Sequence, residues 1–263
     1  MSFNTIVFDI KEGVATLKLN RPKALNSFTR EMHKEVREAM QQVKDDDNIR
    51  CLVLTGEGRG FCAGQDLGDR AVSNDEGRPD LGESVKKNYN PLIRSIMNLP
   101  KPVICAVNGV AAGAGSSIAL ACDIVLAARS ASFIQAFCKI GLVPDSGGTF
   151  NLPRAVGLAR AKGLALLGDR LPAETAEQWG LIWKCVDDDQ LQDEASKLAQ
   201  HFAVQPTAAL GEIKKLLHVS ASNTLDEQLA LEEVAMKTFG QSDNYREGVA
   251  AFMEKRPPRF TPG

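Results

Sequence analysis

The feature that most constrains this chain is the alternation of strand and helix signals along its first half. Continuous apolar runs of strand length occupy residues 51–55, 103–107 and 124–127, which is typical of parallel strands covered on both faces. Ahead of them, apolar residues within 29–44 recur at the 3.6-residue spacing of an amphipathic helix. This order predicts an α/β fold, with a mostly parallel sheet covered by helices.

Local signals before residue 100 refine this expectation. Residues 5–9 and 14–19 are β-rich and flank Lys11-Glu12-Gly13, which predicts an antiparallel hairpin. A helical stripe runs through 85–96, and Pro91 within it is expected to introduce a kink.

The rest of the chain divides into a central loop and a helical second half. Residues 67–83 are rich in Gly, Asp, Ser and Pro, which predicts a long loop of the kind that often borders a site. After Pro153 the pattern is helical almost throughout, and Thr224-Leu-Asp-Glu227 has the spacing of a capping box. We therefore expect a region with strands followed by a helical region.

The composition excludes several classes of protein. Lys and Arg number 31 and Asp and Glu 33, so the net charge of the 263-residue chain is −2, which disfavours a general nucleic-acid binder. The apolar runs are too short for a membrane span, and the first 20 residues do not resemble a secretory signal. Six scattered cysteines without a C-x-x-C pair indicate reduced thiols, no metal site and a cytoplasmic location.

Three glycine-rich segments, at residues 61–67, 108–117 and 140–149, follow predicted strands and are candidate ligand-binding loops. Ligands of α/β sheets bind beyond the carboxyl ends of the strands, and glycine lets backbone amides approach them closely. The first segment is equally consistent with a surface turn, and the second lacks the residues of a dinucleotide or phosphate loop. The second segment therefore offers only backbone amides, which can donate hydrogen bonds to an oxygen that becomes negatively charged during a reaction.

Asp145 lies in the third segment, and its surroundings allow two interpretations. Pro144 before it and two glycines after it suit a turn entering a helix, so the carboxylate is a candidate N-cap. Alternatively it faces the amide donors as a base opposite an oxyanion hole, which is the arrangement needed for acyl enolate chemistry.

Several segments together resemble the enoyl-CoA hydratase/isomerase (crotonase) family over nearly the whole chain. They are NRPKALN at 20–26, FCAGQDL at 61–67, KPVICAVNG at 101–109, GAG at 113–115, CD at 122–123 and GLVPDSGG at 141–148. The resemblance implies a crotonase-like spiral of ββα turns at 1–195, which binds acyl-CoA, and a C-terminal helical trimerisation region at 196–263. A homotrimer or a dimer of trimers is therefore expected.

The resemblance also implies where an acyl-CoA substrate binds. The backbone amides of Gln65 and Ala114 would hold the thioester oxygen. Coenzyme A is then part of the substrate, and no separate cofactor is expected. The residues implied along coenzyme A are Lys23, Ala24 and Leu25 on the pantetheine path and Ala63, Asp66 and Leu67 at the adenine end.

One departure from the hydratase pattern indicates the reaction. Hydratases of the family use two glutamates, and the first falls on Ser117, which leaves Asp145 as the single carboxylate. One carboxylate can move a proton between carbons without activating water, which favours isomerisation. Residues 64–67, 143–145 and 245–260 further resemble relatives that isomerise the ring 1,2-epoxide of phenylacetyl-CoA to an oxepin in phenylacetate degradation.

Other functions within the family stay open. They are Δ3,Δ2-enoyl-CoA isomerisation in β-oxidation, enoyl-CoA hydration, and a dehalogenase-like reaction with Asp145 as nucleophile. An RNA-binding relative is disfavoured because residues 30–44 mix three glutamates with their basic side chains. A companion crotonase of the same pathway is a further expected partner.

Overall fold

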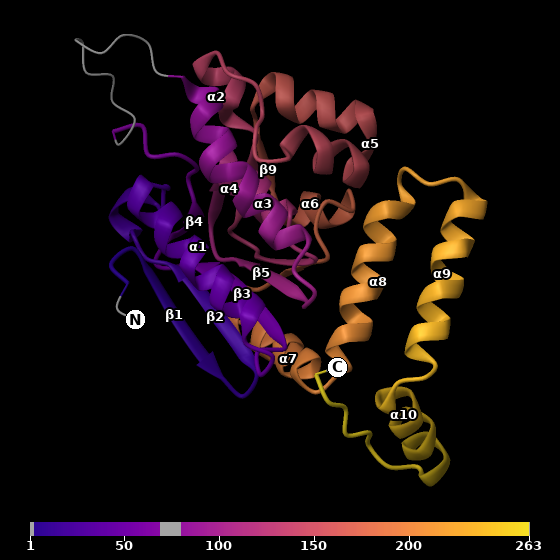
Figure 1. Cartoon of the computed structure of the whole chain (residues 1–263). Coiled ribbons are helices and arrows are strands. Elements are labelled where there is room, and N and C mark those ends of the chain that lie inside the picture. Colours follow the sequence, from indigo (N-terminus) through magenta and orange to yellow (C-terminus); the bar gives the residue numbers. More distant parts are fainter. Residues whose placement is uncertain (1–2, 69–79, 263) are drawn as a thin grey trace.

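The computed structural model describes residues 3–68 and 80–262, and its strands form two sheets (Figure 1). The six-stranded sheet has the order β1-β2-β3-β5-β7-β10, and the four-stranded sheet has the order β4-β6-β8-β9. The strands are β1 (Ile6–Lys11), β2 (Val14–Leu19), β3 (Cys51–Gly56), β4 (Gly60–Cys62), β5 (Val103–Val107), β6 (Val110–Ala112), β7 (Ile124–Ala128), β8 (Ser132–Ile134), β9 (Arg170–Pro172) and β10 (Lys184–Val186).

Helical segments connect these strands and build most of the second half. The α-helices are α1 (Arg30–Asp45), α2 (Leu81–Ser84), α3 (Asn90–Met97), α4 (Ala114–Leu120), α5 (Gly148–Leu167), α6 (Ala173–Gln178), α7 (Leu191–Ala203), α8 (Thr207–Ser220), α9 (Leu225–Phe239) and α10 (Asp243–Glu254). Shorter turns are η1 (Pro22–Ala24) and η3 (Ala136–Ile140), which are 3-10 helices, and η2 (Val85–Tyr89), which is a π-helix.

In the middle of the chain, successive strands alternate between the two sheets. From β3 to β8, each strand of the larger sheet is followed by a strand of the smaller one, and a helical segment then returns the chain to the larger sheet. The result is a spiral of ββα turns, so the expected α/β class is confirmed. β3 and β5 are buried along their whole length, as predicted for parallel strands covered on both faces.

Local signals near the N-terminus also predicted the structure correctly. β1 and β2 pair antiparallel, and the two residues between them, Glu12 and Gly13, have φ of 50° and 79°, as a two-residue hairpin with a type I′ turn requires. The helix predicted within residues 29–44 is α1, and the structure adds a cap, since the side chain of Thr29 accepts a hydrogen bond from the backbone N of Met32.

Near Pro91, where a kink was expected, the helical run changes from the π-helical turn η2 to α3, and Pro91 is the second residue of α3. Two expectations differ from the structure. The predicted loop 67–83 is helical from Leu81, and its residues 69–79 lie outside the described part of the chain. The second half contains the strands β9 and β10, whose three residues are too few to show a periodicity.

The C-terminal helices extend away from the strand-containing body (Figure 1). α7 packs on the larger sheet, against β3 and β5, whereas α8, α9 and α10 project to one side. The boundary expected between residues 195 and 196 therefore falls inside α7, and the projecting region begins with α8. No helix among the described residues is long and apolar enough to cross a membrane.

Candidate active site

The loop after β4 lies against the segment that follows η1. Ala63 N donates to Leu25 O at 2.9 Å, Phe28 N donates to Gly64 O at 2.7 Å, and Asp66 N donates to Phe28 O at 2.9 Å. These hydrogen bonds place the two groups of residues expected to contact coenzyme A, 23–25 and 63–67, side by side.

The same hydrogen bonds constrain the direction of the Gln65 backbone amide from one side. Phe28 and Gln65 form a parallel β-bridge. In such a bridge one residue makes its hydrogen bonds to the two neighbours of the other, and here Phe28 makes them to Gly64 and Asp66. The N–H of Gln65 consequently points to the opposite side. Within residues 3–68 and 80–262, no group accepts a hydrogen bond from it.

Ala114, the second expected donor, is adjacent to this loop. A β-carbon on Gly64 would lie 3.3 Å from Ala114 N, and one on Gly115 would lie 2.2 Å from Cys62 O. Only glycine at these two positions permits so close an approach. Ala114 is the first residue of α4, so its N–H has no partner within the helix. The structure thus brings the backbones around Gln65 and Ala114 together.

Asp66 and its neighbour differ in how the protein holds them. The carboxylate of Asp66 forms an ion pair with Arg21 at 2.8 Å and accepts hydrogen bonds from Ser27 Oγ at 3.3 Å and Gly68 N at 2.9 Å. Leu67, in contrast, has an exposed side chain. Asp66 therefore shapes the loop through contacts within the protein, and Leu67 is accessible to a ligand.

Asp145 does not cap α5. The N-cap is Gly147, with φ of 76°, and no side chain caps the helix. Ser146 also has a positive φ, 53°, which is strained for a residue with a β-carbon. The Ser146 hydroxyl donates to Asp145 Oδ1 at 2.9 Å, and Gly148 N donates to Asp145 O at 2.8 Å. The cap interpretation of Asp145 is therefore wrong.

Gly148 connects the Asp145 turn to the helix that begins with Ala114. A β-carbon on Gly148 would lie 2.8 Å from Ser117 Oγ and 3.5 Å from Gln135 Oε1. Both of these oxygens are buried, and neither has a hydrogen-bond partner in the described part of the chain. Contact between α4 and the start of α5 thus brings the turn that carries Asp145 to the helix that begins with Ala114.

The thiol of Cys62 lies beside the Gly64 loop. Burial raises the pKa of Cys62 to about 12, so the thiol beside the Gly64 loop stays protonated at neutral pH and is a poor nucleophile. Among the described residues, no group of three His, Cys, Asp or Glu side chains could hold a metal ion.

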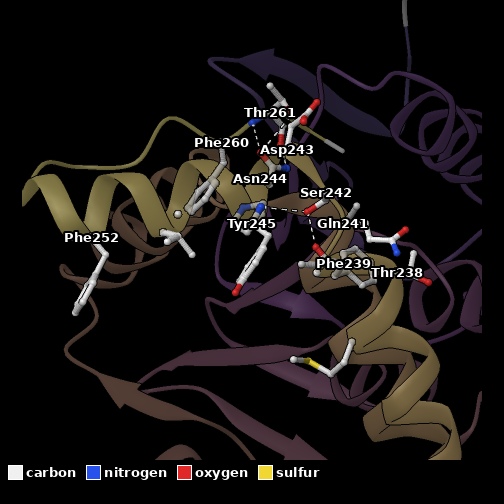
Figure 2. A pocket seen from close by; sticks show the side chains of 17 residues that line it. Thr238, Phe239, Gln241, Ser242, Asp243, Asn244, Tyr245, Phe252, Phe260 and Thr261 are labelled. Atoms are coloured by element: carbon white, nitrogen blue, oxygen red, sulfur yellow. Dashed lines mark hydrogen bonds between the residues drawn. The ribbon is translucent and has the colours of Figure 1, made fainter.

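A large cavity lies elsewhere, among the C-terminal helices (Figure 2). Its volume is about 1040 Å³, and its lining comes from α8, α9, α10 and the last residues of the chain, with Phe239, Tyr245 and Phe260 among them. Asn244 binds Thr261 at 2.9–3.2 Å and ties the chain end to α10. None of the expected catalytic residues lines this cavity.

The fold and the paired loops define the class of protein. The model of the family described as Enoyl-CoA hydratase/isomerase matches residues 9–263, almost the whole chain. The chain belongs to this family.

Individual relatives narrow the comparison. The chain is 59% identical over 256 residues to the 1,2-epoxyphenylacetyl-CoA isomerase of Escherichia coli strain K12. The aligned region covers 97% of this chain and 98% of that protein. It is 48% identical over 261 residues to a protein of Rhodobacter capsulatus named as a probable enoyl-CoA hydratase, with 99% of both chains covered. The crystal structure of an enoyl-CoA hydratase from Bacillus anthracis matches with a TM-score of 0.93 at 32% identity, over 99% of this chain and 100% of that chain.

Sequence reasoning missed three residues that shape this site. Arg21 lies within the NRPKALN segment and pairs with Asp66 of the FCAGQDL segment. Both segments were expected to contact coenzyme A, so an ion pair between their opposite charges could have been predicted. Tyr89 stands in an apolar helical stripe, and a buried tyrosine needs a partner for its hydroxyl. Nothing in the local pattern indicates the positive φ of Ser146.

Proposed function

We propose that this protein is an acyl-CoA isomerase that converts ring 1,2-epoxyphenylacetyl-CoA to the oxepin-CoA in phenylacetate degradation. The observation that carries the proposal is the 59% identity, over nearly the full length of both chains, to the isomerase of that name from Escherichia coli. The packing of the site supports it as well, because the turn that carries Asp145 leads into Gly148, which lies against Ser117 of α4, the helix that begins with Ala114. By the family resemblance, Ser117 stands where hydratases have an acid.

In this proposal the Gln65 and Ala114 amides form the oxyanion hole. Both N–H groups lack partners in the described protein, and their loops are in contact. They would donate to the thioester oxygen and stabilise the charge that forms there in the enolate. One such donor is worth about 3 to 4 kcal/mol of transition-state stabilisation.

Asp145 is the proposed proton carrier. Its carboxylate takes a proton from the methylene carbon next to the thioester, and the electron pair moves into the enolate held by the two amides. The ring bond between the two epoxide carbons opens to the oxepin, and the protonated Asp145 returns the proton to a ring carbon. Substrate and product contain the same atoms, so the reaction consumes no water and needs no cofactor.

Coenzyme A is proposed to lie along the two adjacent segments. Lys23, Ala24 and Leu25 would follow the pantetheine, while Ala63, Asp66 and Leu67 would surround the adenine end. The hydrogen bond between Ala63 N and Leu25 O supports this arrangement because it joins the two segments into one surface.

Enoyl-CoA hydration is a second candidate, favoured by the 48% identity to the Rhodobacter capsulatus protein. A hydratase must activate a water molecule with a second acid or base. Ser117 is buried and carries no charge, so this position does not supply one. The observation therefore favours isomerisation over hydration.

Purified protein incubated with 1,2-epoxyphenylacetyl-CoA tests the proposal directly. We expect a product of unchanged mass with a different ultraviolet spectrum. Crotonyl-CoA in a parallel reaction should gain no water. Rapid hydration of crotonyl-CoA with no turnover of the epoxide would overturn the proposed reaction in favour of the hydratase.

We also propose that α8–α10 assemble the chain into a trimer or a dimer of trimers. Large apolar side chains on these helices are exposed, including Met236 at 73% and Phe252 at 81%. Monomers rarely expose so much apolar surface in one region, whereas a symmetric oligomer covers it. The six cysteines are all free thiols, which supports the proposed cytoplasmic location.

A further inference from the structure

Tyr89 is a completely buried tyrosine that reaches the proposed oxyanion hole through one hydrogen bond. It is the last residue of η2, the π-helical turn before α3. Its hydroxyl donates to Gln65 Oε1 at 2.9 Å. A π-helical turn in a protein frequently marks a functional position.

The side chain of Gln65 is also held at its other end. Its Nε2 donates to Phe28 O at 2.9 Å and to Asp66 O at 3.2 Å. The amide group of this side chain is thus held by hydrogen bonds to three different residues, so it cannot rotate without breaking hydrogen bonds in a half-buried environment.

Aromatic packing fixes the position of the tyrosine ring. The Tyr89 ring meets the buried His33 ring edge-on, with centroids 4.5 Å apart, and lies 6.1 Å from the Phe28 ring. α1 and the segment before it contribute both neighbours. These contacts hold the ring in place, and the Tyr89 hydroxyl donates a hydrogen bond to Gln65 Oε1 from this position.

We propose that Tyr89 is a positioning residue, whose hydroxyl acts through the Gln65 side chain to direct the Gln65 backbone N–H toward the thioester oxygen. The bridge to Phe28 constrains the backbone of Gln65 from one side, and the Tyr89 hydrogen bond constrains its side chain from the other. This inference rests on the proposed oxyanion hole and deepens it. Because Tyr89 is completely buried, the proposed role is to position Gln65 and not to contact the substrate.

The decisive measurement is polarisation of a bound thioester, which does not require turnover. Phenylacetyl-CoA, labelled with carbon-13 at its thioester carbonyl, lacks the epoxide and serves as the probe. An oxyanion hole lowers the carbonyl stretching frequency of the bound probe, which isotope-edited infrared difference spectra record. The wild-type protein is compared with Tyr89→Phe, which removes one oxygen and keeps the ring.

We expect Tyr89→Phe to lose roughly half or more of the frequency shift while the dissociation constant of the probe changes less than about 3-fold. For the epoxide substrate, kcat should fall roughly 10-fold and KM should change little, because misplaced donors impair the transition state more than binding. The control is Thr55→Val, which removes a buried hydroxyl that donates to Ala106 O at 2.8 Å and should leave the shift unchanged.

The Gln65→Ala variant cuts the same link at its other end and keeps the backbone amide, so it tests the proposal if Tyr89→Phe does not fold. The variant with both substitutions should show about the same loss of frequency shift as either single variant, because both changes remove the same hydrogen bond. A full wild-type shift in either single variant would overturn the role of Tyr89 and leave the proposed function standing. A wild-type protein that binds the probe with no shift would refute the oxyanion hole itself, and this inference with it.

Discussion

The α-carbon of Gly148 lies against the hydroxyl of Ser117, so that a β-carbon at position 148 would stand 2.8 Å from Ser117 Oγ. We expect Gly148→Ala to lower the free energy of unfolding by about 1 to 3 kcal/mol, because the added methyl overpacks a buried contact. In a Ser117→Ala background the same substitution should cost less, since the oxygen that the methyl meets is gone.

Denaturant unfolding of the four proteins in this cycle measures the coupling. Ser117→Ala alone should be neutral or stabilising, because the buried Oγ has no hydrogen-bond partner among the described residues. If Gly148→Ala lowered the free energy of unfolding equally with Ser or Ala at position 117, the contact between Gly148 and the Ser117 hydroxyl would be contradicted.

Asp145→Asn tests the proton carrier. Asparagine retains an oxygen that can accept the hydrogen bond from Ser146 but cannot take up a proton at neutral pH. We expect turnover of the epoxide to fall roughly 100-fold or more, with an unchanged melting temperature and unchanged affinity for acyl-CoA. Asp169→Asn, at an exposed carboxylate near Lys139, is the matched control. Turnover within a few-fold of wild type would remove Asp145 from the mechanism.

The attachment of the C-terminal tail should depend on pH through Glu247. Hydrogen bonds from the Arg256 side chain, at 2.6 and 2.9 Å, and from Arg259 N, at 2.7 Å, lower the pKa of Glu247 from 4.5 to about 2. Because the pKa is lower in the folded state, the stabilisation is complete above about pH 4.5 and is lost as the pH falls toward 2.

Hydrogen exchange of residues 255–262, corrected for intrinsic rates, follows this loss. Protection should decline from pH 4.5 downward in the wild-type protein. In Glu247→Gln it should already be low at pH 7 and change little with acid. Equal protection of the two proteins at pH 7 would show that this ion pair does not hold the tail.

The exposed face of α10 should decide the oligomeric state. Phe252 is 81% exposed in the isolated chain, so Phe252→Asp should leave the fold intact and shift sedimentation toward the 28.4 kDa monomer. Phe252→Leu keeps an apolar side chain and should sediment like wild type. A wild-type protein that sediments only as a monomer at micromolar concentration would end the proposal of a trimer.

Local sequence signals determined those parts of the fold that depend on neighbouring residues. The turn at Glu12-Gly13 and the capping box of Thr224 and Glu227 formed as predicted, because each is made within a few residues of the chain. The parallel strands β3 and β5 were readable for a similar reason, since burial on both faces leaves a continuous apolar run.

Tertiary structure alone decided the details of the candidate site. The hydrogen bond from Tyr89 to Gln65 joins residues 24 positions apart, and the contact of Gly148 with Ser117 joins two helices. No local pattern encodes such a pairing. The cap of α5 shows the same limit at short range, because Gly147 takes the N-cap position that Asp145 was a candidate for. Ser146 and Gly147 have positive φ directly before α5, and in the fold the start of this helix packs against α4.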